Sequence, residues 1–116
     1  MSHDTCIFCQ IAEGKIPSKR VKETDTLLAF EDVHPGAPTH ILVIPKEHVA
    51  SVNDLETRHT AVLGEMVLLA KAIAKEKNID QTGFRLVMNT GPQAGQSVFH
   101  IHLHVLGGRF LAWPPG

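Results

Sequence analysis

Histidines alternate with branched apolar residues near the end of the chain, over residues 100–106. Successive side chains of a β-strand point to opposite faces, so residues two apart share a face about 6.6 Å from one another. The pattern therefore predicts a strand with His100, His102 and His104 along one face. A solvated strand would more naturally carry Thr, Lys, Glu or Ser, so this row indicates chemistry. Imidazole is a nucleophile, an acid or base, and a metal ligand, so the spacing alone leaves catalysis and metal binding both open.

Earlier in the chain, the spacing of apolar residues predicts two helices and several strands. In chain order these are a short helix over residues 6–13, a hairpin over 21–31, a Pro- and Gly-rich loop over 32–38, a central strand over 39–45, a long helix over 57–77 and a strand over 84–89. His40 begins the predicted central strand, and it gains interest only if the fold brings it near the three histidines.

The long predicted helix carries an unusually wide apolar stripe. Apolar residues recur at Val62, Met66, Leu69 and Ile73, with a second apolar row beside them. Such a stripe indicates either deep burial, or one flank on the chain's own sheet and another on a second subunit. We expect the second arrangement, a homodimer.

A Gly-rich loop over residues 90–97 leads into the histidine segment. Such a loop can present backbone N–H groups and the Ser97 hydroxyl to an anion. An ordinary hairpin connection is the alternative, because a G-x-x-x-G spacing in a loop is a weak signal by itself. The anion interpretation gains from position, since the loop delivers its donors to the start of the histidine strand.

The composition indicates one domain that binds neither nucleic acid nor membrane. A chain of 116 residues is long enough for a single core. Its formal charge is −1, and its Lys and Arg residues form no basic run that would follow a phosphate backbone. No stretch approaches the roughly 18 apolar residues of a membrane span, and residues 1–5 lack the basic and apolar regions of a signal peptide. We therefore expect a soluble, cytoplasmic protein.

The segment 100–106 is similar to the motif of the histidine-triad (HIT) family, and the chain resembles the Hint branch, the purine nucleoside phosphoramidases. Further matches run along nearly the whole chain: Ile7-Phe8, residues 28–32, residues 37–46, Asn89, Gly95-Gln96-Ser97, Gly107-Gly108-Arg109 and Trp113-Pro114-Pro115-Gly116. So many matches in order make the resemblance specific. The segment 110–112 departs from the family, so no side-chain contact of the tail is carried over.

The resemblance implies an α+β fold, with a five-stranded antiparallel sheet, one short helix and one long helix. Residues 1–116 would form a single HIT domain, and two copies would join their sheets into ten strands. The tail over residues 109–116 would lie near the partner subunit.

The resemblance also implies an enzyme that hydrolyses purine nucleoside 5′-phosphoramidates, and acyl-adenylates, to the nucleoside monophosphate. His102 would be the nucleophile and form a covalent nucleotidyl-histidine, with its ring held by the carbonyl of His100. His104 would bind phosphate oxygens, and His40 would lie beside the leaving group. The reaction would need no cofactor.

The nucleotide-binding residues carried over from the family fall into three groups. Asp32 would bind the ribose hydroxyls. Phosphate oxygens would be bound by Asn89, Ser97 and the backbone of Gly95 and Gln96. The apolar slot for the purine would be formed by Ile7, Phe8, Ile11, Phe30 and Val33. Each of these five is also compatible with plain core, above all Ile11 and Val33.

Cys6 and Cys9, the only cysteines, form a C-x-x-C pair. In a reducing compartment such a pair is more often a metal or redox element than a disulfide. Some family members hold zinc with such a pair and two histidines, which match His48 and His100 here. The resemblance thus implies a possible structural zinc site. Two buried thiols beside a histidine that bonds the backbone are the equal alternative.

Two other functions stay open from the sequence. A nucleotide-binding regulatory or scaffold protein would keep the pocket with little turnover, although a pure binder has no need of a nucleophile. A catalytic metal centre in the histidine row is the weaker alternative, because no carboxylate accompanies the histidines.

Overall fold

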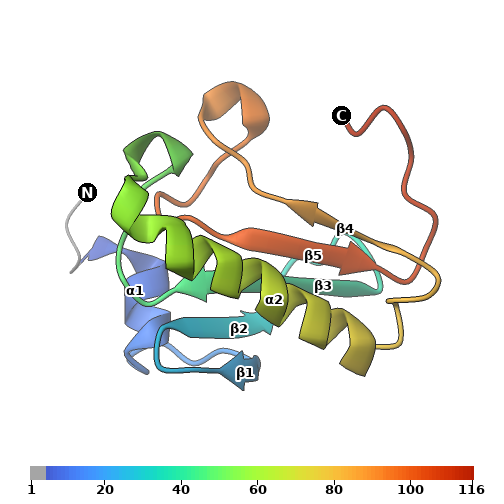
Figure 1. Ribbon diagram of the computed structural model, residues 1–116, viewed down its shortest axis with the longest axis horizontal. Helices are drawn as coiled ribbons and strands as arrows, with labels where there is room; N and C mark the ends of the chain where they lie inside the picture. The colour runs from blue at the N-terminus through green and yellow to red at the C-terminus, as the bar shows by residue number, and fades with distance from the viewer. Residues whose placement is uncertain (1–4) are drawn as a thin grey trace.

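Five antiparallel strands form one sheet in the order β1-β2-β3-β5-β4, and the long helix α2 lies across one face of it (Figure 1). The computed structural model describes residues 5–116. The strands are β1 (Arg20–Glu23), β2 (Leu27–Glu31), β3 (Thr39–Pro45), β4 (Phe84–Val87) and β5 (Leu103–Gly107), and the helices are α1 (Ile7–Ala12) and α2 (Thr60–Glu76). The predicted α+β fold, with its antiparallel sheet and two helices of unequal length, is confirmed.

The central strands are apolar and buried from Leu27 to Phe30 in β2 and from Ile41 to Pro45 in β3, because both faces of the sheet are covered there. Alternate residues, such as Ile41 and Val43, pack with Met66 and Ile73 of α2. The residues between them pack on the other face, in a second cluster formed with the residues of α1. Strand alternation places successive side chains in the two clusters in turn.

Strand pairing brings together histidines that are far apart in the sequence. In the β3–β5 ladder, Leu42 lies opposite His104, and His40 lies opposite Leu106. His40 and His104 are therefore diagonal neighbours on one face of the sheet. Leu103 and Val105 point to the opposite face and pack in the cluster with α2. The predicted alternation of histidines and core residues is confirmed for the paired part of the segment.

The histidine strand is shorter than predicted, because β5 begins at Leu103 rather than at His100. The antiparallel register would place Ile101 opposite Pro45, where β3 ends. Proline has no N–H to donate, so the ladder stops there. The Ile101 N–H instead donates to the Val49 carbonyl at 2.8 Å. His100 and His102 thus precede the strand, and the His100 carbonyl accepts from the His102 side chain.

Two of the other element boundaries differ from the prediction by two or three residues, and the remaining ones agree within one residue. The strand predicted to reach residue 89 ends at Val87, and the long helix begins at Thr60, after the 3-10 turn Thr57–His59. In the part of the chain that the structure describes, no helix is long and apolar enough to cross a membrane.

Candidate active site

Three histidines, His40, His102 and His104, converge near the start of β5. The His40 Nε2 and His104 Nδ1 atoms lie 2.8 Å apart. The ring centroids of His102 and His104 are 5.0 Å apart. The fold therefore brings His40 next to the histidines of residues 100–104, which makes His40 a candidate functional residue.

His102 has one ring nitrogen committed to the backbone and the other open for chemistry. Its Nδ1 lies 2.7 Å from the carbonyl oxygen of His100. Because a carbonyl only accepts, this Nδ1 carries the proton, and the lone pair of the neutral ring is on Nε2. Phe8 of α1 contacts the ring in a T-shaped arrangement, with centroids 5.1 Å apart. The structure thus presents a buried imidazole with its nucleophilic nitrogen and orientation both fixed.

His104 has the complementary state. The Gly36 N–H donates to His40 Nδ1 at 2.8 Å, so a neutral His40 carries its proton on Nε2, facing His104 Nδ1. The proton of a neutral His104 is then on Nε2, a buried nitrogen with no hydrogen-bond partner among residues 5–116. A buried donor without a partner is costly, so this N–H suits a ligand oxygen.

Both rings of this pair are neutral at pH 7. Burial lowers the pKa of His104 to about 4, and charge repulsion from His102 and His40 adds to the effect while Asp32 opposes it. Burial also lowers the pKa of His40, again opposed by Asp32. The cause in both cases is that an imidazolium loses solvation when it is buried.

Asp32 lies beside this pair, at the start of the loop between β2 and β3. Its Oδ1 accepts from the His34 N–H at 2.8 Å, and its Oδ2 is 3.4 Å from His40 Nε2. The carboxylate is thus held by the backbone and retains acceptor capacity, which suits hydroxyl groups of a ligand.

The five residues expected in the purine slot divide into two groups. Phe8, Ile11 and Phe30 are buried in the cluster around α1. Ile7 and Val33 are 47% and 85% exposed, so a core role for Val33 is wrong. An apolar ligand face would therefore meet Ile7 and Val33 first.

The loop before the histidines satisfies much of its own backbone. Gly95 N donates to the Pro92 carbonyl and Gln96 N to the Gly91 carbonyl, both at 3.1 Å. The Gln96 side chain is buried and donates to the carbonyls of Ala50 and Val98. The backbone N–H groups of Gly95 and Gln96, which were expected to bind phosphate, thus form hydrogen bonds within the loop.

Ser97 is exposed and Asn89 is half-buried just beyond the end of β4. Ser97 is the more accessible of these two expected phosphate donors, and Gln96 has a structural role that the sequence did not indicate.

A second cluster consists of Cys6, Cys9, His48 and His100, and so includes the first histidine of the row. The Nδ1 atoms of His48 and His100 are 3.3 Å apart, and each lies 3.3 to 3.5 Å from a cysteine sulfur. With the usual zinc–sulfur and zinc–nitrogen bond lengths, ligand atoms of a tetrahedral site are separated by about 3.3 to 3.8 Å. All four ligand atoms lie within 4.8 Å of one another. The residues therefore fit zinc, as the family resemblance implied.

The protonation state of the cluster also fits a metal. His100 Nε2 lies 2.7 Å from the Pro45 carbonyl, so its proton is there and its Nδ1 lone pair faces the sulfurs. Burial raises the pKa of the Cys9 thiol to about 12, with further contributions from Cys6 and Glu13. A bound cation reverses this preference and favours the thiolate.

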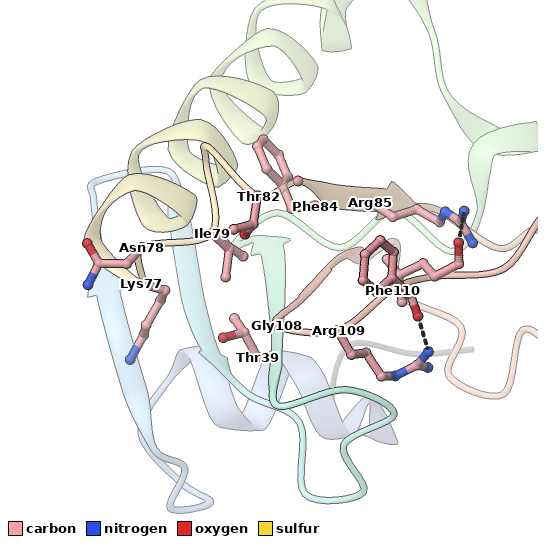
Figure 2. Close-up of a pocket in the computed structure, with 12 residues that line it drawn as sticks. Thr39, Lys77, Asn78, Ile79, Thr82, Phe84, Arg85, Gly108, Arg109 and Phe110 are labelled. Atoms are coloured by element: carbon pink, nitrogen blue, oxygen red, sulfur yellow. Dashed lines mark hydrogen bonds between the residues drawn. The ribbon is translucent and has the colours of Figure 1, made fainter.

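A cavity of about 750 Å³ has no histidine in its lining. Figure 2 shows the lining residues. The cavity is lined by residues from the end of α2, the following turn, β4 and the segment 108–111, with Thr39. Two of its cations already donate to the tail, since Arg85 Nη2 meets the Leu111 carbonyl and Arg109 Nη1 the Phe110 carbonyl. Because no histidine lines it, the cavity is separate from the candidate active site.

The protein is thus an α+β protein whose antiparallel sheet carries a row of histidines held in fixed tautomers, and comparisons with known proteins identify its family. Residues 5–112 match the family described as "Scavenger mRNA decapping enzyme C-term binding". A "14 kDa zinc-binding protein" of Brassica juncea is 47% identical over 95% of this chain and 98% of its own.

"Adenylylsulfatase HINT1" of Arabidopsis thaliana is 45% identical over 99% of this chain and 79% of its own. The crystal structure of a HIT family hydrolase from Legionella pneumophila has a TM-score of 0.95 and 46% identity, and covers 97% of this chain and 100% of that one. The chain belongs to the histidine-triad family and to its Hint-like branch, as the sequence indicated.

Three groups that shape the site were not found from the sequence. Two are backbone groups, the Gly36 N–H and the Pro45 carbonyl, and the third is the Arg109 side chain, which donates to the Gly36 carbonyl. Backbone groups leave no signal in a sequence. Arg109 lay within a matched segment, but the match carried no role.

The lowered pKa of His104 makes the stability of the protein depend on pH. Its ordinary pKa is 6.5, so between pH 6.5 and about 4 the unfolded ring binds a proton that the folded ring does not. This contribution is complete above pH 6.5 and is lost as the pH falls toward 4. We expect the free energy of unfolding, measured with urea, to fall less steeply with decreasing pH in His104→Asn than in the wild type. Equal slopes would contradict the assignment.

Proposed function

We propose that this protein hydrolyses purine nucleoside 5′-phosphoramidates, and acyl-adenylates, to the nucleoside monophosphate through a covalent nucleotidyl-histidine. The observation that carries the proposal is the pairing of opposite tautomers. His102 offers a lone pair on Nε2, and His104 beside it offers a proton on a buried Nε2 without a partner among residues 5–116. A phosphoryl group needs these two functions next to each other, a nucleophile for phosphorus and a donor for its oxygens.

The reaction proceeds in two steps. His102 Nε2 attacks the α-phosphorus, a nitrogen–phosphorus bond forms, and the bond to the amine breaks with its electron pair on the leaving nitrogen, which takes up a proton. Water then attacks phosphorus and releases a proton, and the electron pair of the nitrogen–phosphorus bond returns to His102. The His100 carbonyl stabilises the cationic ring between the two steps, because it accepts from Nδ1 throughout.

The surrounding residues bind the rest of the substrate. Asp32 accepts from the ribose hydroxyls, and the exposed Ile7 and Val33 border the purine slot. Ser97 and Asn89 donate to phosphate oxygens, and the amides of Gly95 and Gln96 join them by exchanging their bonds within the loop. His40 lies beside the leaving group.

The names of the relatives support a hydrolase of this kind. The Legionella structure is named a HIT family hydrolase, and the Arabidopsis relative is named an adenylylsulfatase. A phosphoramidate and an adenylyl sulfate both place the leaving group on the α-phosphorus, so one nucleophile serves either substrate. The similarity extends over 97% of this chain for the Legionella protein and over 99% for the Arabidopsis protein.

The nucleophile is tested with a fluorogenic adenosine 5′-phosphoramidate. His102→Ala should lower kcat/KM by about 10⁴-fold or more, because no other group replaces the covalent step. AMP binding, measured by calorimetry, should change little. His34→Ala, which removes an exposed histidine of the neighbouring loop, is the matched control and should retain activity.

Turnover by His102→Ala at the wild-type rate would refute the mechanism. A wild-type protein that binds AMP tightly but releases no amine would instead be a nucleotide-binding regulatory or scaffold protein.

The chain is further proposed to act as one domain, and as a homodimer that extends the sheet to ten strands. Strand β4 lies at an edge of the sheet, where its outer backbone groups are free to pair with a second copy. Val67 and Leu68 of α2 are 49% and 65% exposed, although α2 packs its other flank on the sheet. Trp113 is 80% exposed, and one face of its ring lies 6.0 Å from the Arg85 guanidinium. The other face of the ring is then available to the partner subunit.

Sedimentation velocity tests the dimer. The wild type should sediment as a dimer, and Leu68→Glu should shift the protein toward the monomer, because the substitution buries a charge in the proposed interface. Lys19→Glu is the control, because it changes the charge of an exposed residue next to β1, at the opposite edge of the sheet from β4. A wild type that sediments as a monomer would exclude the dimer.

We propose that zinc is bound by Cys6, Cys9, His48 and His100, because their ligand atoms lie close enough together to surround one ion. Such an ion would supply structural stability, because it fastens α1 to the segment before β5. The reaction itself needs no cofactor. The Brassica relative is named a zinc-binding protein, which supports the assignment.

Metal analysis of the purified protein tests the zinc site. We expect about one zinc ion per chain in the wild type and almost none in a Cys6→Ala, Cys9→Ala variant, which should also unfold at a lower temperature. Asp32→Asn is the control, because Asp32 belongs to a separate cluster with His40 and His104. Zinc retained by the cysteine variant would place the metal elsewhere.

A further inference from the structure

Arg109 connects the end of β5 to the loop that precedes β3. Its guanidinium donates to the Gly36 carbonyl, from Nη2 at 2.8 Å and from Nε at 3.2 Å. The remaining Nη1 donates to the Phe110 carbonyl at 3.0 Å, as Figure 2 shows. A planar guanidinium with three such bonds has a fixed orientation, so the Gly36 carbonyl is held in place.

The approach of these two segments depends on a glycine. Gly108 has a φ of +93°, and a Cβ atom there would lie 2.9 Å from Pro38 Cβ. Other residues are strained at this φ and would clash with the proline. The chain after β5 therefore lies directly on the loop, which brings the Arg109 side chain to Gly36.

Gly36 is held on both sides of its Cα. Arg109 fixes its carbonyl, and its N–H donates to His40 Nδ1 at 2.8 Å. This donation forces the proton of a neutral His40 onto Nε2, which faces His104 Nδ1 at 2.8 Å. The proton of His104 is consequently directed from Nε2 into the site. A chain of three hydrogen bonds thus runs from the exposed Arg109 to the donor that faces the substrate.

We propose that Arg109 is a positioning residue for the phosphoryl-transfer site, which keeps His104 an Nε2–H donor by holding Gly36 against His40. The inference rests on the proposed function for its effect on turnover. Its effect on the two tautomers is independent of that function, because it follows from the hydrogen bonds of the substrate-free protein. Arg109 touches neither the substrate nor the reacting atoms.

The experiment combines imidazole NMR with kinetics. Long-range ¹H–¹⁵N correlation of the substrate-free protein should show His40 and His104 as Nε2–H tautomers in the wild type and as mixed tautomers in Arg109→Ala. With the adenosine phosphoramidate, kcat should fall about tenfold, as expected for the loss of a charge-assisted hydrogen bond, while KM changes less than about twofold. Arg109→Lys should restore part of kcat, because an ammonium still donates to the Gly36 carbonyl.

Lys77→Ala is the matched control. It removes another cation from the cavity that Arg109 also lines, just beyond the end of α2 (Figure 2). Lys77 is not part of the loop that contains Gly36. The tautomers and kcat of this variant should equal those of the wild type.

The outcomes separate this inference from the proposed function. Wild-type tautomers or an unchanged kcat in Arg109→Ala would overturn it, as would an Nδ1–H tautomer of His40 in the wild type. A wild type with the expected tautomers but no turnover, and mixed tautomers in Arg109→Ala, would contradict the proposed function and support the positioning of His104 by Arg109.

Discussion

A backbone N–H only donates and a backbone carbonyl only accepts, and the histidine site depends on this asymmetry. The Pro45 carbonyl fixes the proton of His100, the His100 carbonyl fixes that of His102, and the Gly36 N–H fixes that of His40. Each of these three rings, when neutral, therefore has one nitrogen that donates and one that carries a lone pair. A backbone group, and not a charged side chain, decides which nitrogen is which. Burial reinforces this state for His40 and His104, because it lowers the pKa of both and keeps them neutral.

The end of β3 explains why such backbone groups are available. Pro45 cannot continue the ladder toward β5, so the segment 100–102 is released from regular pairing. His100 then serves two clusters at once: its Nδ1 faces the cysteine sulfurs, and its carbonyl accepts from His102. Phe8, which lies between Cys6 and Cys9 in the sequence, contacts the His102 ring. The candidate metal cluster and the candidate nucleophile are thus joined through one residue and one short helix.

The alternation over residues 100–106 was sufficient to predict that Leu103 and Val105 face the core and that His104 lies on the opposite face. It did not predict the start of β5, because the limit comes from a proline in another strand. The spacing alone did not predict the convergence of His48 and His100, since 52 positions separate them, and only the family resemblance placed them in one site. The family resemblance supplied Asp32 and His40, and the register of β3 with β5 explains why His40 meets His104. Gly36 acts only through its backbone, so no residue pattern indicated its role.

The most direct test of this account is to locate the phosphorus in the quenched reaction intermediate. The protein is mixed with an adenosine 5′-phosphoramidate, quenched within one turnover, and examined by intact mass and by ³¹P–¹⁵N coupling in ¹⁵N-histidine-labelled material. We predict a nucleotidyl adduct on His102 with phosphorus bonded to Nε2, because Nδ1 is committed to the His100 carbonyl. Phosphorus on Nδ1 of His102 or on another residue would contradict the account.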